Sequence, residues 1–558
     1  METSTALLSM TEGARAVARA RALVAMRQFA DAERELLQVL EADPRDRNVL
    51  DALADFYASM GRPAPAAQVL ARLIELGPRE PGHYFALAAA YEQLGRMDDV
   101  VEICRRLTAA RPDLAVAHFN LACYLRRLGH LEESLTSHRT ALELGIERPE
   151  EVWSNIAVIL GELHRHAEAR EALEQALELN RDWIPALYNL ALWHEEHGNR
   201  AAATELFERV LAIDPHYDDA LMRLTHMVTV SSPQDPLIAR LERALERPGL
   251  APLVREGLHF ALGKAFDDCG DYARAFTHYR TGNEASRKRL RPYDRAATES
   301  LFRRLRERFT AAWLGSVEPV SDRPLLFVCG MYRSGSTLLE QMLAAHPAVT
   351  SGGELGWFNA RLARNDVRWP EHVTPELLRA VGKGYLEHLE RRFPGAVYVC
   401  DKRPDNFLYV GLLKALFPRL RVLHTVRDAR DVCLSIYFQQ FGDALPYASD
   451  LGDIAHYLRG YRELMQHWRG LMQESILDVD YGRLVASPER ELREVCRFLG
   501  LEWCAGMLDF RNAAARVRTA SVWQVRQPLY TRSLGRWRHY AAQLGALGDL
   551  MTEEADGR

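Results

Sequence analysis

The sequence predicts two kinds of structure in one chain, an N-terminal all-α repeat superhelix and a C-terminal P-loop-like α/β domain built on a parallel sheet. Two observations predict this fold class. Prolines and glycines recur every 34 residues through the first half of the 558-residue chain, and a period of this length is typical of stacked helix pairs. In the second half, short apolar runs alternate with helical patterns, as in parallel α/β sheets.

The N-terminal half repeats two amphipathic helical patterns in every period. The recurring marks are Pro44, Pro78, Pro112, Gly61, Gly95 and Gly129. A glycine permits a tight turn between two helices, and a proline interrupts the chain after the second. The pattern resembles tetratricopeptide repeats, which we expect over 14–227. A helical connector follows over 228–320, with a further repeat-like helix pair over 256–287.

One polar position recurs inside the repeats. Asn120, Asn155 and Asn189 each lie nine residues before the glycine position of their own repeat. Equivalent positions line the concave groove of a stacked superhelix, and an amide offers both a donor and an acceptor to an extended backbone. We expect these side chains to bind a protein or peptide acceptor. The alternative is that they only bridge neighbouring helices.

The second half opens on a strand, a loop and a helix start that together predict an anion site. Leu325–Val328 reads as a buried strand, Gly330 and Gly335 bracket a turn, and a helical pattern starts at Thr337. Backbone N–H groups of such a loop point at an anion. The spacing is that of the loop G-x-x-x-x-G-K-[ST], with Ser336 in place of the lysine. The loop therefore predicts a bound nucleotide phosphate, and the missing lysine disfavours ATP hydrolysis.

Three further motifs follow the loop in the sequence. They are His346-Pro-Ala-Val-Thr-Ser-Gly-Gly-Glu354, Val399-Cys-Asp-Lys402, and Val422-Leu-His-Thr-Val-Arg-Asp-Ala-Arg-Asp431 with Cys433-Leu-Ser-Ile-Tyr437. With the loop, they resemble the sulfotransferases that use 3′-phosphoadenosine 5′-phosphosulfate (PAPS), in particular the tyrosylprotein sulfotransferase branch. The resemblance covers about 322–540, and the strand–helix alternation favours a parallel sheet. We expect the sulfotransferase domain over 321–550.

The resemblance implies roles in sulfuryl transfer. The loop residues that would surround the 5′-phosphosulfate are Arg333, Ser334, Gly335, Ser336 and Thr337. Glu354 would be the general base for a tyrosine phenol, whose pKa is near 10. Lys402 would neutralise the oxygen that leaves with the phosphate, and Arg333 would share this catalytic role. Because many small-molecule sulfotransferases use a histidine as base, His346 and His424 are the rivals of Glu354.

The remaining implied roles concern the nucleotide. Arg427 would clasp the 3′-phosphate bidentately, Ser435 would add a hydroxyl, and Tyr481 would contact adenine. A closing segment that includes Arg526 would cover the cofactor. The serine or threonine that supports the transition state would come from 514–521, with Ser521 as the candidate.

Composition limits the classes of partner and of cofactor. Residues 1–320 carry 40 basic and 48 acidic side chains, and residues 321–558 carry 31 and 28, which gives the net charge of −5. Neither half is basic enough to favour nucleic acid. The eight cysteines form no C-x-x-C pair, so we expect no metal and no disulfide framework. We also expect no membrane span and a cytoplasmic protein.

The sequence therefore predicts a PAPS-dependent sulfotransferase whose repeats present the acceptor. A tyrosine of a protein or peptide is the favoured acceptor, because the predicted base is a glutamate and the repeats are of a peptide-binding kind. Two alternatives stay open. The acceptor is a glycan or a small-molecule hydroxyl, or the repeats are a scaffold beside a weakly active nucleotide-binding domain.

Overall fold

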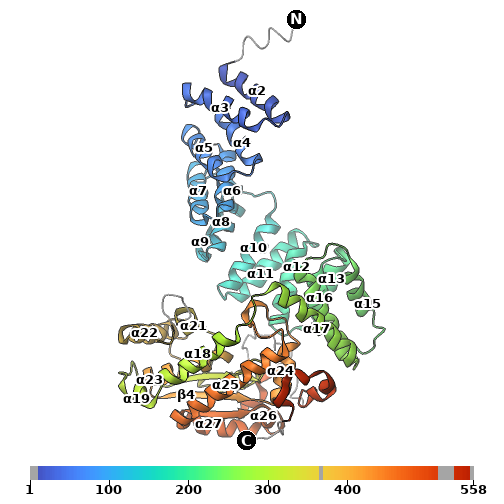
Figure 1. Cartoon of the computed structure of the whole chain (residues 1–558), viewed down its shortest axis with the longest axis vertical. Coiled ribbons are helices and arrows are strands. Elements are labelled where there is room, and N and C mark those ends of the chain that lie inside the picture. Colours follow the sequence, from blue (N-terminus) through green and yellow to red (C-terminus); the bar gives the residue numbers. More distant parts are fainter. Residues whose placement is uncertain (1–10, 79, 363–368, 372, 513–532, 553–558) are drawn as a thin grey trace. The chain divides into compact units, whose positions relative to one another are not determined.

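The computed structural model describes residues 11–552 apart from 79, 363–368, 372 and 513–532 (Figure 1). The chain divides into two compact units, Met1–Leu190 and Ala191–Arg558. The division falls inside the region predicted to hold the repeats. Each unit has its own architecture and is described separately.

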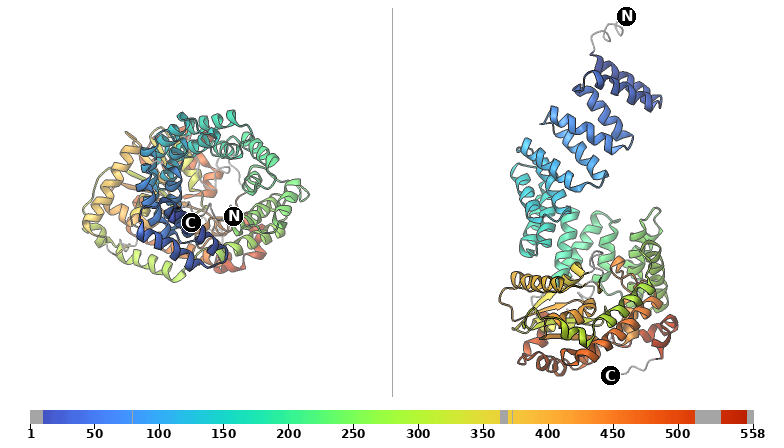
Figure 2. Two further views of the ribbon diagram at one scale, coloured as in Figure 1. Left: turned by 90° about the horizontal axis from the view of Figure 1, so that it is seen from above. Right: turned by 60° about the vertical axis from the view of Figure 1, so that its left-hand side comes forward.

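The first unit consists of successive helix–turn–helix pairs (Figure 2). Its glycine turns at Gly61 and Gly95 have positive φ angles of 63° and 71°, a conformation that costs other residues more. Leu53, Leu87 and Leu121, each 34 residues apart, are buried in one core cluster, so the period of the sequence is also the period of the packing. The helices are α2 (Glu12–Ala25), α3 (Phe29–Ala42), α4 (Arg47–Ser59), α5 (Pro63–Leu76), α6 (Pro81–Gln93), α7 (Met97–Ala110), α8 (Ala115–Arg127), α9 (Leu131–Glu143), α10 (Pro149–Glu162), α11 (His166–Leu179) and α12 (Ile184–Glu196), the last of which continues past residue 190.

The second unit begins with further helices. Two of them, α16 and α17, pack closely as a pair across a turn at Gly270, whose φ is 78°. This pair occupies the segment where the sequence predicts an additional repeat-like helix pair. The helices before the sheet are α13 (Arg200–Ile213), α14 (Asp218–Met227), α15 (Pro236–Glu246), α16 (Pro252–Asp268), α17 (Tyr272–Arg289), α18 (Arg295–Arg308) and α19 (Ala311–Ser316).

A five-stranded, fully parallel sheet with the order β2-β3-β1-β4-β5 forms the centre of the second unit. In its register, Val328 of β1 is opposite Lys402 of β3 and Leu423 of β4. The strands are β1 (Leu325–Gly330), β2 (Val349–Gly353), β3 (Tyr398–Lys402), β4 (Leu420–Val426) and β5 (Ile476–Asp480). The predicted α/β class is therefore confirmed, and β2 is a strand that the sequence reading did not predict.

Helices cover both faces of the sheet, as a parallel sheet requires. Leu326 and Val328 belong to an apolar cluster that contains residues of α20 and α27. On the opposite face, the Phe327 ring lies 6.2 Å from that of Phe358 and 5.8 Å from that of Tyr385. The helices and 3-10 helices are α20 (Ser336–Ala344), α21 (Trp357–Leu362), α22 (Pro375–Arg392), η2 (Pro404–Tyr409), α23 (Val410–Leu416), α24 (Ala429–Tyr437), η3 (Gly442–Ala444), α25 (Leu451–Met472), η4 (Gln473–Ser475), α26 (Tyr481–Ala486), α27 (Pro488–Leu499), η5 (Ala505–Asn512), η6 (Arg536–Gln543) and η7 (Gly545–Met551).

The five strands end at one edge of the sheet, where ligands bind in open α/β folds. The glycine-bounded loop follows β1, and Lys402 is the last residue of β3. Glu354 follows β2, Arg427 follows β4 and Tyr481 follows β5. The fold thus carries residues from all the predicted motifs to the same edge.

Candidate active site

The loop after β1 is held in a conformation that depends on its glycines. Gly335, with φ of 104°, precedes the first residue of α20. A Cβ atom at Gly335 would lie 2.5 Å from Cδ2 of Tyr481, and one at Gly330 would lie 2.5 Å from Oγ1 of Thr425. Both glycines are therefore required by close packing. The turn leaves the first N–H groups of α20 at the sheet edge, where an anion is favoured.

Ser334 supports the loop from within. Its hydroxyl donates to the carbonyl of Met331 at 2.6 Å and lies 2.7 Å from Oγ1 of Thr425, and its backbone N–H also donates to Met331. The side chain is 1% exposed. The geometry thus gives Ser334 a structural part in the loop, whereas Ser336 and Thr337 lie in the first turn of α20.

Arg333 and Arg427 connect the first motif with the fourth. Nε of Arg333 donates to Oγ of Ser435 at 3.0 Å. Arg427 donates to the backbone carbonyl of Arg333 at 3.1 Å and to that of Ser533 at 2.6 Å. Its guanidinium carbon lies 4.9 Å from the centre of the Tyr481 ring, within the range of a cation–π contact.

The Nε group of Arg427 is buried and, among the described residues, has no hydrogen-bond partner. An unpaired buried donor is costly. A guanidinium anchored by its two terminal nitrogens, with Nε unpaired, suits an anion that arrives from outside the protein. The predicted phosphate residues Arg333, Arg427, Ser435 and Tyr481 are therefore brought together by direct contacts.

Glu354 and Lys402 form an ion pair at the same edge of the sheet. Nζ of Lys402 donates to Oε1 of Glu354 at 2.6 Å, and it lies 3.7 Å from Oε2 of Glu340. Lys402 and Glu340 are buried, whereas the Glu354 side chain is 40% exposed. One ammonium therefore lies between a buried carboxylate and an accessible one.

Glu340 is a site residue that the sequence reading missed. It lies on α20, and its Oε1 accepts bonds from the Ser351 hydroxyl at 2.7 Å and the Gly353 N–H at 3.1 Å. Burial raises the pKa of Glu340, and the nearby Lys402 opposes that rise. Through these two hydrogen bonds Glu340 stabilises the end of β2, directly before Glu354. A charged residue in a helix that is otherwise mostly apolar was the signal that could have revealed it.

The two rival histidines already use both ring nitrogens. His346 contacts the carbonyl of Glu502 through Nε2 at 2.9 Å and accepts the N–H of Ala348 through Nδ1 at 3.1 Å. His424 contacts Asp478 through Nδ1 at 2.7 Å and the hydroxyl of Tyr461 through Nε2. Burial lowers the pKa of His424. Both nitrogens of each ring are therefore engaged, whereas the Glu354 side chain is 40% exposed; its role as base stays a prediction.

A cavity of about 930 Å³ adjoins the phosphate residues within the second unit. It opens between β4, the helices α24 and α25, and residues 534–538, and both Ser334 and Arg427 belong to its wall. Its further basic side chains, which the sequence reading did not single out, are Arg430, Arg462, Arg469 and Arg538. Four carboxylates line the same cavity, those of Asp428, Asp431, Asp478 and Asp480. Two of the arginines pair with them, Arg430 with Asp428 and Arg469 with Asp478.

Some predictions lie beyond the geometry of this site. Ser521 and Arg526 fall outside the described residues. Asn120, Asn155 and Asn189 lie on α8, α10 and α12 and are partly exposed, which leaves their peptide-binding role a prediction. In the part of the chain that the structure describes, no group of three His, Cys, Asp or Glu side chains is placed to hold a metal ion. None of the described helices is long and apolar enough to cross a membrane.

Comparison with known proteins identifies both regions of the chain. A model of the sulfotransferase family matches residues 324–505. Tetratricopeptide-repeat models match residues 17–81, 52–115 and 149–216. The chain therefore carries tetratricopeptide repeats in its N-terminal region and a sulfotransferase-family domain in its C-terminal region, which confirms the predicted resemblance.

The chain is also similar to individual proteins and to a solved domain. Over 415 residues the chain is 31% identical to an uncharacterized protein of Aquifex aeolicus (strain VF5), covering 71% of this chain and 54% of that protein. Over 245 residues it is 27% identical to protein-tyrosine sulfotransferase 1 of Danio rerio, covering 39% and 66%. The sulfotransferase domain from the Synechococcus PCC 7002 olefin synthase is 22% identical, with a TM-score of 0.31, covering 40% and 88%. The chain spans less than two thirds of the length of the first two relatives.

Proposed function

We propose that the protein transfers the sulfuryl group of PAPS to an acceptor hydroxyl, with a tyrosine of a protein or peptide as the acceptor. The observation that carries this proposal is the Glu354–Lys402 pair, with 2.6 Å between the two charged atoms, at the sheet edge that also holds the phosphate loop. This pair supports the proposal because a carboxylate can accept the proton of the acceptor hydroxyl and an ammonium can stabilise the charge on the leaving group.

These two side chains account for the proton and for the negative charge that the proposed reaction moves. The acceptor oxygen attacks sulfur while its proton passes to Glu354, and the bond from sulfur to the bridging oxygen breaks. The electron pair stays on that oxygen, so adenosine 3′,5′-bisphosphate leaves with an added negative charge. Lys402 stabilises this charge, because an ammonium close to the developing anion binds the transition state more tightly than the ground state.

The Lys402–Glu354 contact links the proposed role of Glu354 as base to that of Lys402 as the cation for the leaving group. Lys402 binds Oε1 of Glu354 directly, so this oxygen is engaged as long as the contact lasts. When Lys402 turns to the phosphosulfate, it releases Glu354 to accept a proton. Arrival of the donor would thus activate the base. In the arrangement seen here, Oε2 of the buried Glu340 lies 3.7 Å from the same ammonium.

A tyrosine is favoured as the acceptor on two grounds. The base is a carboxylate in a chain related to proteins named protein-tyrosine sulfotransferase. The repeat region carries Asn120, Asn155 and Asn189 at equivalent positions, where amides would bind the backbone of an extended peptide. We propose that the repeats bind the protein or peptide that is modified.

The test is a transfer assay with labelled PAPS and the full chain. Tyrosine peptides, matched phenylalanine peptides, glycans and small phenols are offered as acceptors, and mass spectrometry locates the sulfate. We expect label on tyrosine only, and a rate lower by about 10²–10⁴-fold in Glu354→Gln. Label on glycans or small phenols would show that these molecules, and not tyrosine, are the acceptors. No transfer to any acceptor would overturn the proposal, and an unchanged rate in the variant would remove Glu354 as base.

A further inference from the structure

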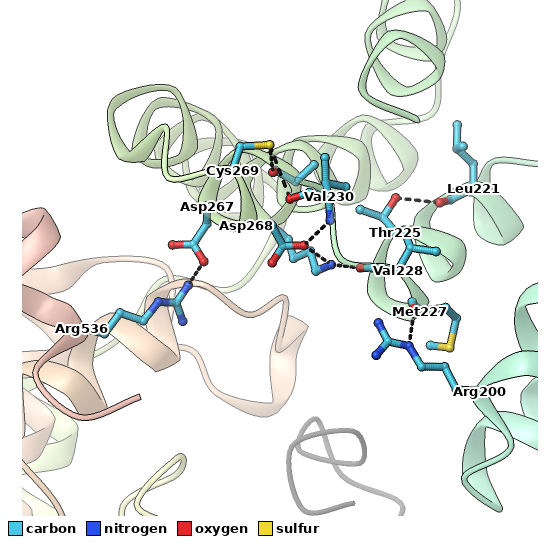
Figure 3. Close-up of polar contacts among 12 residues, drawn as sticks. Arg200, Leu221, Thr225, Met227, Val228, Val230, Asp267, Asp268, Cys269 and Arg536 are labelled. Atoms are coloured by element: carbon cyan, nitrogen blue, oxygen red, sulfur yellow. Dashed lines mark hydrogen bonds and ion pairs between the residues drawn. The ribbon is translucent and has the colours of Figure 1, made fainter. Parts of the chain in front are cut away.

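The end of α16 contains two adjacent aspartates that bind different parts of the second unit. Asp267 pairs with Arg536 (Figure 3), and it also accepts the hydroxyl of Tyr540. Asp268 instead pairs with Lys264 at 2.6 Å and accepts the N–H of Val230 at 3.1 Å. One carboxylate therefore holds the C-terminal region of the chain, and its neighbour holds the segment that follows α14.

The Asp267 contacts are well shielded from water. The Asp267 side chain is 14% exposed and that of Arg536 is 31% exposed. Burial, and then the charge of Asp267, raise the pKa of Tyr540 well above its ordinary value, so its hydroxyl keeps the proton that it donates. An aromatic cluster surrounds the contact, with the Tyr272 ring 5.3 Å and the Phe438 ring 4.9 Å from that of Tyr540.

Residues 533–540, which Asp267 holds from one side, contact the phosphate residues on the other. Asp431 accepts the N–H groups of Gly535 at 2.7 Å and Trp537 at 3.0 Å. The backbone carbonyl of Ser533 accepts from Arg427 at 2.6 Å, and its hydroxyl lies 3.0 Å from that of Tyr481. The segment thus fixes the guanidinium that is proposed to bind the 3′-phosphate.

The same helix pair also supports α24, which carries Ser435. Asn283 of α17 donates to the backbone carbonyl of Tyr437 at 2.8 Å. The rings of Tyr279 and Phe438 are stacked with 3.8 Å between their centres. Figure 1 shows α17 beside α24, and both helices contact η6. Two elements of the phosphate site therefore rest on α16 and α17.

We propose that Asp267 is a positioning residue for the nucleotide, which joins the α16–α17 helix pair to residues 533–540 and so holds Arg427 and Tyr481 in their binding geometry. The inference rests on the proposed function, because it assigns those residues to PAPS. Asp267 does not touch the Glu354–Lys402 pair, so its loss changes the binding of the donor and not the chemical step.

The test compares Asp267→Asn with Asp268→Asn, which removes an equal charge at the neighbouring position. Binding of adenosine 3′,5′-bisphosphate to the full chain is measured by calorimetry. Asp267→Asn loses charged hydrogen bonds that order the binding site, so we expect its affinity for the nucleotide to fall by about tenfold or more. Asp268→Asn keeps those bonds, so its affinity should be unchanged. In the transfer assay, KM for PAPS rises in Asp267→Asn while kcat stays at the wild-type value.

Hydrogen exchange gives an independent readout of the same contact. The N–H groups of Gly535 and Trp537 exchange faster in Asp267→Asn and at the wild-type rate in Asp268→Asn. Tyr540→Phe removes one hydrogen bond to Asp267 and keeps the aromatic ring. In this variant the same two N–H groups should exchange faster by a smaller factor, and it replaces Asp267→Asn in the test if that variant does not fold.

Three results would overturn the inference. The first is unchanged nucleotide affinity in Asp267→Asn. The second is an equal loss in both aspartate variants, which would indicate general weakening of α16. The third is a fall in kcat with KM unchanged, which would place Asp267 in the chemical step. A wild-type chain that binds no adenosine 3′,5′-bisphosphate is a different failure, since it removes the proposed function and the inference together.

Discussion

The buried carboxyl group of Asp401, the residue before Lys402 on β3, should make the free energy of unfolding depend on pH. Its carboxylate is 1% exposed and accepts bonds from the Tyr385 hydroxyl at 2.9 Å and from Asn406 Nδ2 at 3.2 Å. Burial raises the pKa of Asp401 from 3.8 to about 6, although both donors oppose the rise. The protonated form is therefore favoured in the folded state, and ionisation above this pKa costs stability.

The sign and size of the effect follow from linkage. Because the folded-state pKa is the higher one, the stabilising contribution is complete below about pH 4 and is lost as the pH rises through about 6. A rise of about two units corresponds to about 3 kcal/mol, of which about 2 kcal/mol falls between about pH 4.5 and pH 8. Asparagine at position 401 resembles the protonated acid and has no such dependence.

The assay compares Asp401→Asn with the wild type by urea unfolding at several pH values. Pulsed proteolysis with mass spectrometry reads the second unit separately, because a two-unit chain is not expected to unfold in one transition. The difference in unfolding free energy should move in favour of the variant by about 2 kcal/mol between about pH 4.5 and pH 8. Asp443→Asn, at an exposed position of η3, is the control. If the unfolding free energies of Asp401→Asn and the wild type changed in parallel with pH, the pKa of Asp401 would not be raised in the folded state.

Two further variants test the site directly. Lys402→Met keeps the side-chain volume and removes the cation, so kcat in the PAPS assay should fall by about 10²-fold or more; an unchanged kcat would exclude Lys402 from leaving-group stabilisation. Gly335→Ala places a Cβ atom 2.5 Å from Tyr481 at a φ of 104°, so calorimetry should show weaker nucleotide binding, with Gly545→Ala, where a Cβ meets no atom within 4 Å, as the control. Equal affinities in the two glycine variants would contradict the packing argument.

The fold could be predicted because its signals are local and repeated. The 34-residue period places equivalent leucines in one core, and four apolar runs correspond to β1, β3, β4 and β5. The strand β2 was missed because Val349–Gly353 is short and ends in two glycines, which are poor strand formers. Its pairing with β3 is tertiary information that a short sequence window does not contain.

The candidate site shows the same division between local and tertiary information. Lys402, Arg427 and Tyr481 end or follow parallel strands, so the fold class alone brings them to one edge. Glu340 contacts Lys402 from a helix that looks apolar, and Asp267 contacts Arg536 across 269 positions of sequence. The first contact depends on how α20 packs on the sheet, and the second on how α16 packs against η6. The catalytic roles of these residues remain predictions.

The loop after β1 and Arg427 are proposed to bind a nucleotide with phosphates on both its 5′ and 3′ oxygens. The most direct measurement is calorimetric binding of adenosine 3′,5′-bisphosphate and of adenosine 5′-monophosphate to the full chain. Charged hydrogen bonds to the additional phosphate predict that the bisphosphate binds about tenfold more tightly or better, and that Arg427→Ala abolishes this preference. Equal affinities for the two nucleotides, or no binding of the bisphosphate, would contradict the account.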